Sequence, residues 1–190
     1  MKVLLATSFL FVFVLPSQAQ VSVLNSENEQ SRFTVEETPG EPRVRHPMPV
    51  PDGVLEELQT DGTVKSCLKD NPLEPGKSLS SWFVASVIHL DGPREADLAV
   101  VPSFQGQERM CFQSPAGIGL FWLFRKHGER YELILSTWGG GLEILTTKTD
   151  SHRDVRTGTL GQAGRSLTNI TFHFNGTRYV ANKETTQEQR

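Results

Sequence analysis

Apolar and polar residues recur along the chain with two different periods. Over residues 52–71, apolar side chains repeat at the three- and four-residue spacing of one helix face, in two pieces. Asp52 is placed to cap the first piece, and Thr60 or Asp61 the second. Beyond this stretch, from residue 81, apolar and polar residues alternate with the two-residue period of strands. The pattern predicts a mainly β (α+β) protein with a short N-terminal helical segment.

The β-rich region contains one pattern twice, over residues 81–136 and 142–182. Each copy reads as a strand, a polar turn, a strand led by Asp, a connection and an aromatic hairpin. The two hairpins, FWLFRKHGERY and ITFHFNGTRY, both have a glycine turn followed by Arg-Tyr. Asn-Gly between alternating apolar residues is a strong hairpin signal, because both positions tolerate positive φ. We therefore predict two similar four-stranded antiparallel units within a single domain over 52–182.

The first 19 residues have the features of a signal peptide. Lys2 precedes an apolar run from Val3 to Leu15, which is shorter than the roughly 20 residues that span a bilayer. Ser17 and Ala19 stand at the two positions that a signal peptidase reads. We expect cleavage after Ala19, export to the periplasm or the extracellular space, and no membrane-spanning segment in the mature chain. An uncleaved membrane anchor is the alternative.

Two further segments have no pattern of a packed element. Residues 20–51 are polar, charged and rich in proline, and their apolar residues are isolated. Such a composition buries too little surface to offset the entropy of ordering, so we predict a flexible leader. Residues 183–190 read as a polar tail.

Composition excludes few functions but argues against nucleic acid as a partner. The chain has 190 residues, of which 37% are hydrophobic and 22% charged, and a formal net charge of −3 without any basic run. Another exported protein or an envelope component is the kind of partner we expect. In an oxidising compartment Cys67 and Cys111 are expected to form a disulfide, with two buried free thiols as the alternative.

The stretch HLDGPREADLAVV is a polar loop followed by an apolar strand led by Asp97. It resembles the start of FG-GAP or VCBS-like repeats of exported β-propeller proteins, and the aromatic hairpins resemble the later strands of such repeats. Two units cannot close a propeller of four or more blades. The chain is also similar to small exported bacterial proteins of unknown function. The resemblance implies a β-repeat fold and an exported location, and no activity.

The same loop is a degenerate version of a calcium-binding loop. His89 and Pro93 stand where oxygen ligands belong, which leaves Asp91, Glu95 and Asp97. We expect a turn here, with Asp97 bonded to backbone amides at the start of a strand, and no metal or cofactor. An ion held by the three carboxylates with backbone carbonyls is the alternative.

Two other places carry candidate chemistry. His152, with Asp150 and Asp154, falls in the second repeat where Asp91 and Asp97 fall in the first; an equivalent turn or an acid–base pair would explain the group. Trp138, beside glycines expected to form the turn between the units, is a candidate contact residue, and core packing is its alternative.

The chain lacks a nucleophile elbow, a phosphate loop and a Cys-x-x-Cys motif, so we assign no catalytic residue. The leading hypothesis is a non-catalytic, protein-binding or inhibitory module, with contact candidates at Trp138, Asp91, Asp97, His152 and Asp154. A cell-envelope hydrolase that uses carboxylates and His152 from the two turns is the first alternative, and a structural envelope component is the second. Turns that converge at one concave site would favour the hydrolase.

Overall fold

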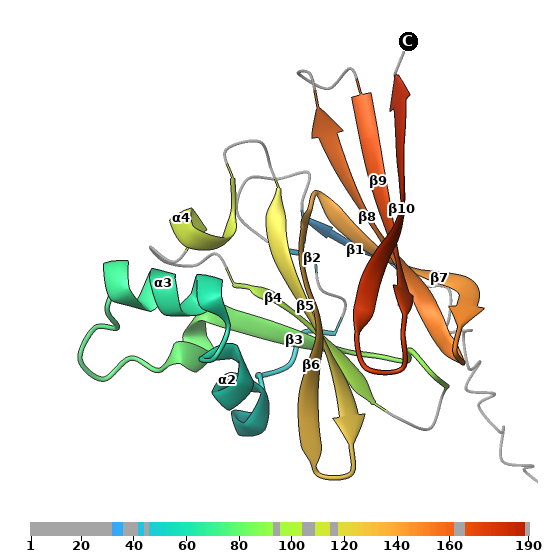
Figure 1. Ribbon diagram of the computed structural model, residues 1–190. Coiled ribbons are helices and arrows are strands. Elements are labelled where there is room, and N and C mark those ends of the chain that lie inside the picture. Colours follow the sequence, from blue (N-terminus) through green and yellow to red (C-terminus); the bar gives the residue numbers. More distant parts are fainter. Residues whose placement is uncertain are drawn as a thin grey trace, which may run out of the picture.

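The computed structural model describes residues 32–35, 42–43, 46–92, 96–103, 109–114, 118–161 and 166–188. Within them the protein consists of two antiparallel β-sheets and a few short helices (Figure 1). This confirms the predicted mainly β class. The predicted signal peptide, and the loop residues Pro93 and Glu95, lie outside the described residues.

The helical segment comprises two consecutive α-helices, as predicted: α2 (Asp52–Leu58) and α3 (Gly62–Asp70). Two short helices follow later in the chain, the 3-10 helix η1 (Leu79–Trp82) and α4 (Arg109–Phe112). The side chain of Asp61 caps α3 by accepting hydrogen bonds from the amides of Thr63 and Val64. The N-cap of α2 is Pro51, which offers no side-chain acceptor, so the assignment of Asp52 as a cap is wrong. Among the described helices, none has the length and apolarity to cross a bilayer.

Two four-stranded meanders follow the helices, and both are formed by strands consecutive in sequence. The first comprises β3 (Phe83–Ile88), β4 (Asp97–Pro102), β5 (Gly119–His127) and β6 (Arg130–Gly139). The second comprises β7 (Gly141–Thr149), β8 (His152–Gly161), β9 (Ser166–Phe174) and β10 (Tyr179–Glu188). The two predicted four-stranded antiparallel units are therefore confirmed.

The final hairpins of the two meanders have the same register. Tyr131 pairs with Lys126, and Tyr179 pairs with Phe174, each across a turn whose glycine has positive φ. Three residues after each tyrosine the ladder shifts by one residue, at Ile134 in β6 and at Asn182 in β10. A bulge at the same position of both hairpins shows that they share backbone geometry as well as residue pattern.

β4 and β8 are equivalent too, although Asp97 begins β4 whereas β8 begins at His152 and contains Asp154 as its third residue. Leu98 pairs with Phe124 in the first meander, and Val155 pairs with Phe172 in the second. Asp97 and Asp154 each stand one residue before these pairs, so they occupy the same position of the repeat.

The connection between the meanders is tighter than the wide glycine turn that the sequence predicts. Gly139 ends β6 and Gly141 begins β7, with Gly140 alone between them. A Cβ atom at Gly139 would lie 2.9 Å from Cβ of Thr157 on β8, so only glycine permits this approach of the two sheets.

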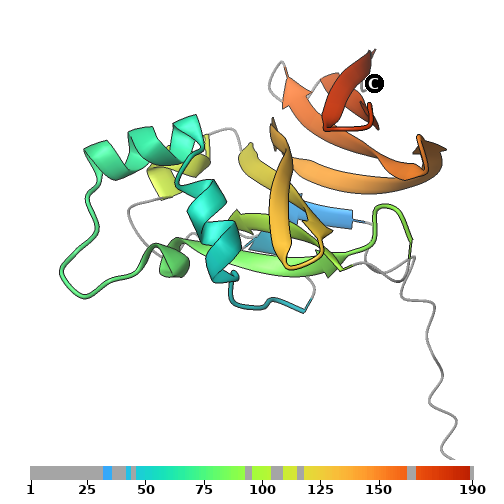
Figure 2. The ribbon, with the colours of Figure 1, turned by 60° about the horizontal axis from the view of Figure 1, so that its bottom comes forward.

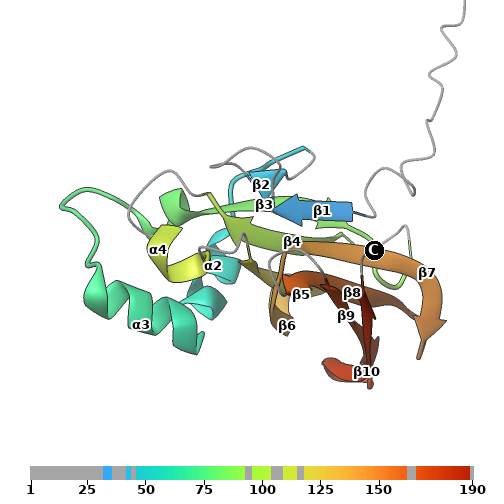
Figure 3. The same ribbon diagram turned by 90° about the horizontal axis from the view of Figure 1, so that it is seen from above.

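The predicted flexible leader contributes strands that its composition did not indicate. β1 (Arg32–Val35) pairs with the outer edge of β7, and β2 (Pro42–Arg43) pairs with β1 (Figure 3). Met48 bridges to Ala85 on the outer edge of β3. β1 alternates polar and apolar residues over four positions, RFTV, and β2 has two residues, so neither is long enough to stand out as a strand within the polar leader. At the other terminus, β10 extends through residues 183–188, past the point where the sequence predicts a polar tail.

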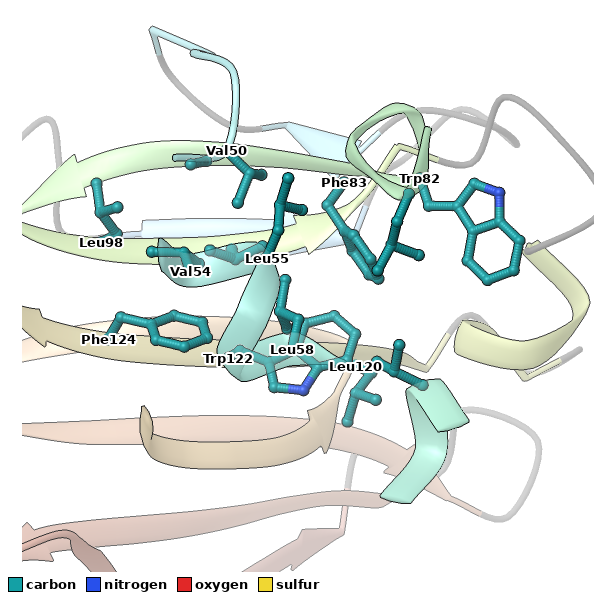
Figure 4. Close-up of a cluster of buried hydrophobic side chains, with 14 of the residues drawn as sticks. Val50, Val54, Leu55, Leu58, Trp82, Phe83, Leu98, Leu120, Trp122 and Phe124 are labelled. Carbon is teal, nitrogen blue, oxygen red and sulfur yellow. The ribbon is translucent and has the colours of Figure 1, made fainter. Parts of the chain in front are cut away.

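The first sheet is the middle of three layers, with the helices on one face and the second sheet on the other (Figure 2). β5 shows this directly. Trp122 and Phe124 face the helices, where Leu58 of α2 reaches them (Figure 4), while Phe121 and Leu123 face the second sheet. Burial on both faces explains why the segment GLFWLF is apolar without alternation.

A disulfide joins Cys67 on α3 to Cys111 on α4, with a Cα–Cα distance of 5.7 Å. The predicted pairing is confirmed, and the alternative of two free thiols is wrong. The bond ties the helical layer to the connection between β4 and β5. Nδ2 of Asn71, just beyond α3, lies 3.3 Å from the sulfur of Cys111.

Candidate functional site: the junction of the two polar turns

The two polar turns that the sequence marks as equivalent are in direct contact. The amide of Arg153, at the start of β8, donates a hydrogen bond of 2.7 Å to the carbonyl oxygen of Leu90, in the turn after β3. This bond joins the two meanders through backbone atoms. The two turns therefore meet, but the hydrolase hypothesis requires them to meet at one concave site. Whether the site is accessible depends on the side chains around it.

Asp97 is the first residue of β4 and is 0% exposed. Its Oδ2 accepts a hydrogen bond from the amide of Leu90, and its Oδ1 accepts one from the amide of Lys126 on β5, both at 3.0 Å. The carboxylate therefore holds the turn and β5 together, as the sequence predicted for an aspartate at a strand start.

Asp154, at the equivalent position, is 3% exposed and has different surroundings. Its Oδ1 lies 3.2 Å from Nδ1 of His173 on β9. The same ring nitrogen lies 2.6 Å from Oγ1 of Thr149. A nucleophile–base–acid relay needs the hydroxyl and the carboxylate on opposite nitrogens of the imidazole. Here both are on Nδ1, so the three side chains do not form such a relay.

Tyr179 lies near both of these carboxylates and is 5% exposed. Its hydroxyl donates a hydrogen bond of 2.5 Å to the carbonyl oxygen of Arg153. Burial, above all, raises the pKa of this phenol far above its ordinary value. The negative charges of Asp97, Asp154 and Asp91 raise this pKa further, against a smaller lowering by Arg153. The phenol is thus a neutral hydrogen-bond donor that holds the backbone of Arg153 at the start of β8.

His152 and Asp91 lie at the border of the junction and are partly exposed. The ring of His152 stacks on Phe174 with a centroid distance of 3.9 Å, and its Nδ1 is 3.0 Å from the carbonyl oxygen of Asp150. The guanidinium of Arg125 lies 5.2 Å from the centroid of the same phenylalanine. Oδ1 of Asp91 is buried and has no hydrogen-bond partner among the described residues.

Trp138 does not belong to this junction. It lies within β6, where a loop was expected, and it is 40% exposed. It pairs with Leu120, at the end of the β5–β6 ladder opposite to Lys126 and Tyr131. Seven residues of strand separate Trp138 from Tyr131, or roughly 23 Å. Of the five candidate contact residues, four are therefore brought together and one lies apart.

The arrangement is better suited to fixing the two turns in place than to binding a substrate or an ion. The most central carboxylates are buried, and both oxygens of Asp97 are already hydrogen-bonded to amides. Within the described part of the chain, no three His, Cys, Asp or Glu side chains are grouped to hold a metal ion.

Sequence reasoning did not single out Tyr179 and His173 as members of this group. The repeated Arg-Tyr after the hairpin turn was the available signal for Tyr179. For His173 there was none, because its neighbours Asp154 and Thr149 are distant in sequence and meet it only across the β-ladders.

The chain has no match among protein-family models, curated proteins or solved structures. What can be assigned is the architecture: helices, then two four-stranded antiparallel meanders joined at a buried polar junction.

Proposed function

We propose that the protein is an exported, non-catalytic binding module that adds an extended strand of a partner protein to the outer edge of β10. The observation that carries the proposal is this edge. β10 is the last strand of the second sheet, and no described strand pairs with its outer side. Of the side chains described between Val180 and Glu188, all are exposed except the half-buried Thr185. An unpaired row of backbone donors and acceptors is the usual site of strand addition.

The opposite edge of the same sheet supports the proposal. There β1, which has four residues, adds to β7 through backbone pairing. The sheet therefore already takes up one short strand at an edge. The predicted signal peptide places the partner in the periplasm or outside the cell, as another exported protein or an envelope component.

Thr186 offers a way to block this edge without disturbing the sheet. Its Oγ1 lies 3.1 Å from Oγ1 of Thr168 on β9, the close side-chain approach of a non-hydrogen-bonded pair. In such a pair the backbone N–H of Thr186 points away from β9. Proline at this position removes an outward donor and keeps the bonds to β9.

The test is capture of partners from the native envelope with the mature chain and two variants. Wild type and Thr186→Val should retain the same protein, and Thr186→Pro should lose it while keeping its circular dichroism and melting temperature. Equal capture by all three chains, or capture of nothing specific by wild type, would refute strand addition at β10.

A hydrolase is the second candidate, because the two polar turns converge. The burial of Asp97 and Asp154 and the arrangement around His173 oppose it. An envelope hydrolase would lose activity in Asp154→Asn while remaining folded, and the binding module would lose no capture of its partner in that variant.

A further inference from the structure

The second inference rests on the proposed strand addition and concerns the chemistry of the strand that is added. We infer that the partner strand is basic, with Lys or Arg at two positions four residues apart on one face. The two charged side chains described along the outer half of β10 carry the inference.

Glu184 and Glu188 lie on one face of β10, on either side of Thr186. Their partners on β9 are Ile170 and Ser166, and that of Thr186 is Thr168, so the neighbouring strand supplies no charge on this face. Both carboxylates are exposed, and neither forms an ion pair with another described residue. Four residues of strand separate them by roughly 13 Å.

This segment is the part of β10 best suited to pairing. The bulge at Asn182 interrupts the ladder, and bulges twist a strand away from a flat neighbour. Beyond the bulge, the pairing with β9 is regular from Glu184 to Glu188. An incoming strand would therefore lie along this stretch, with its own side chains opposite the two glutamates.

A second copy of the chain is a poor occupant of this site. Full antiparallel overlap of two such segments places Glu184 of one copy opposite Glu188 of the other, and the symmetry repeats the contact. Like charges directly opposite each other across a strand pair are destabilising, whereas opposite charges stabilise the pair. The charge pattern thus favours a different chain with basic residues at these positions.

The probe is a set of three synthetic peptides of about ten residues, with alternating Thr and Val. Two positions four residues apart carry Lys in the first peptide, Gln in the second and Glu in the third. Binding is followed through the backbone amide chemical shifts of residues 184–188 in the mature chain. The Lys peptide should bind about three- to tenfold more tightly than the Gln peptide, and the Glu peptide should bind least.

Two sets of variants separate the effect of the glutamate charges from the effect of the open backbone edge. The double variant Glu184→Gln, Glu188→Gln should bind all three peptides alike, and added salt should reduce the preference of wild type. Thr186→Pro should bind none of them, and Thr186→Val should behave as wild type.

The other outcomes would contradict either the basic partner strand, the strand addition at β10 or the identity of the added strand. If wild type binds the three peptides equally at β10, the partner strand need not be basic, and strand addition stands. If no peptide shifts these amides, or if Thr186→Pro binds as well as wild type, both proposals fail. A concentration-dependent dimer in sedimentation that Thr186→Pro abolishes would make a second copy the occupant instead.

Discussion

At the scale of residues, equivalent positions of the two units have acquired different roles. Asp97 binds two backbone amides within its own meander, whereas Asp154 faces His173 across the β8–β9 ladder. Tyr179 packs near both carboxylates and bonds to Arg153. The residues that look most like chemistry in the sequence are therefore bonded within their own meanders, next to the backbone bond from Arg153 to Leu90 that joins the two.

Replacement of Asp97 by alanine should strongly destabilise the fold. The change leaves the amides of Leu90 and Lys126 without their acceptor, at about 1–3 kcal/mol for each buried donor. The free energy of unfolding, from urea titration, should fall by about 3 kcal/mol. Asp91→Ala is the matched control and should change it by less than about 1 kcal/mol. Equal effects of the two variants would contradict the structural role of Asp97.

Replacement of Tyr179 by phenylalanine should act in two pH ranges. At neutral pH the loss of the hydrogen bond to Arg153 should cost about 1 kcal/mol. The pKa of the folded-state phenol is raised, so its contribution is complete below the unfolded pKa of about 10 and is lost as the pH rises above it. Wild type should therefore lose stability above about pH 10 more steeply than Tyr179→Phe.

Tyr131→Phe is the control for this experiment, because Tyr131 holds the same position in the first hairpin. That variant keeps Tyr179 and should keep the alkaline loss. An identical pH dependence of wild type and Tyr179→Phe would show that the phenol is not the group responsible.

At the scale of elements, the two meanders share the turn, the bulge and the register of their last hairpins. They differ in burial and in their first hairpins, because β3 and β4 pair regularly whereas the pairing of β7 with β8 is shifted between Ile144 and Lys148. β5 is buried on both faces from Gly119 to Phe124, while β9 alternates between partly exposed polar residues and buried phenylalanines only from Thr171 to Phe174. The close crossing of β6 over β8 lets the first sheet lie on the second.

The substitution Gly139→Ala tests this crossing. The added methyl would lie 2.9 Å from Cβ of Thr157 and 3.0 Å from the carbonyl oxygen of Gly141. Neither atom is the end of a flexible side chain, so neither can move away without a shift of the backbone. We expect a loss of about 1–3 kcal/mol in the free energy of unfolding. Gly62→Ala, at the start of α3, meets no atom within 4 Å and should be neutral or slightly stabilising. A neutral Gly139→Ala would mean that the sheets lie further apart.

At the scale of the whole molecule, the chain forms three layers tied together at several points. The disulfide joins the helices to the connection after β4, and the leader pairs with edges of both sheets. The exposed edge of β10 is on the side of the second sheet away from the leader. This asymmetry supports the proposal that a partner strand adds to β10.

Export and oxidation can be tested in one measurement. The intact mass of the secreted chain should correspond to a start at Gln20, because the signal peptidase is expected to cut after Ala19. Under non-reducing conditions it should be two hydrogens lighter than the reduced form, as required for the Cys67–Cys111 bond. A mass that includes residues 1–19 would refute cleavage, and two thiols open to alkylation would refute the bond.

The sequence by itself determined the class of the fold, the two four-stranded units, the helical start and the cysteine pair. These features depend on local periodicity and on turn residues such as Asn175-Gly176. The cysteine pair was predicted from the expected export to an oxidising compartment. The structural role of Asp97 was also predictable, because an aspartate at a strand start commonly binds nearby amides.

Only the tertiary structure decided how the units meet and what they leave open. Three contacts join residues far apart in sequence through backbone or buried polar groups. They are the bond between Leu90 and Arg153, the packing of Tyr179 near three carboxylates, and the addition of β1 to β7. Such contacts leave no periodic trace, because they depend on where whole strands lie. The exposed edge of β10 likewise follows from the order of the strands in the sheet, which cannot be predicted from the residues of β10 alone.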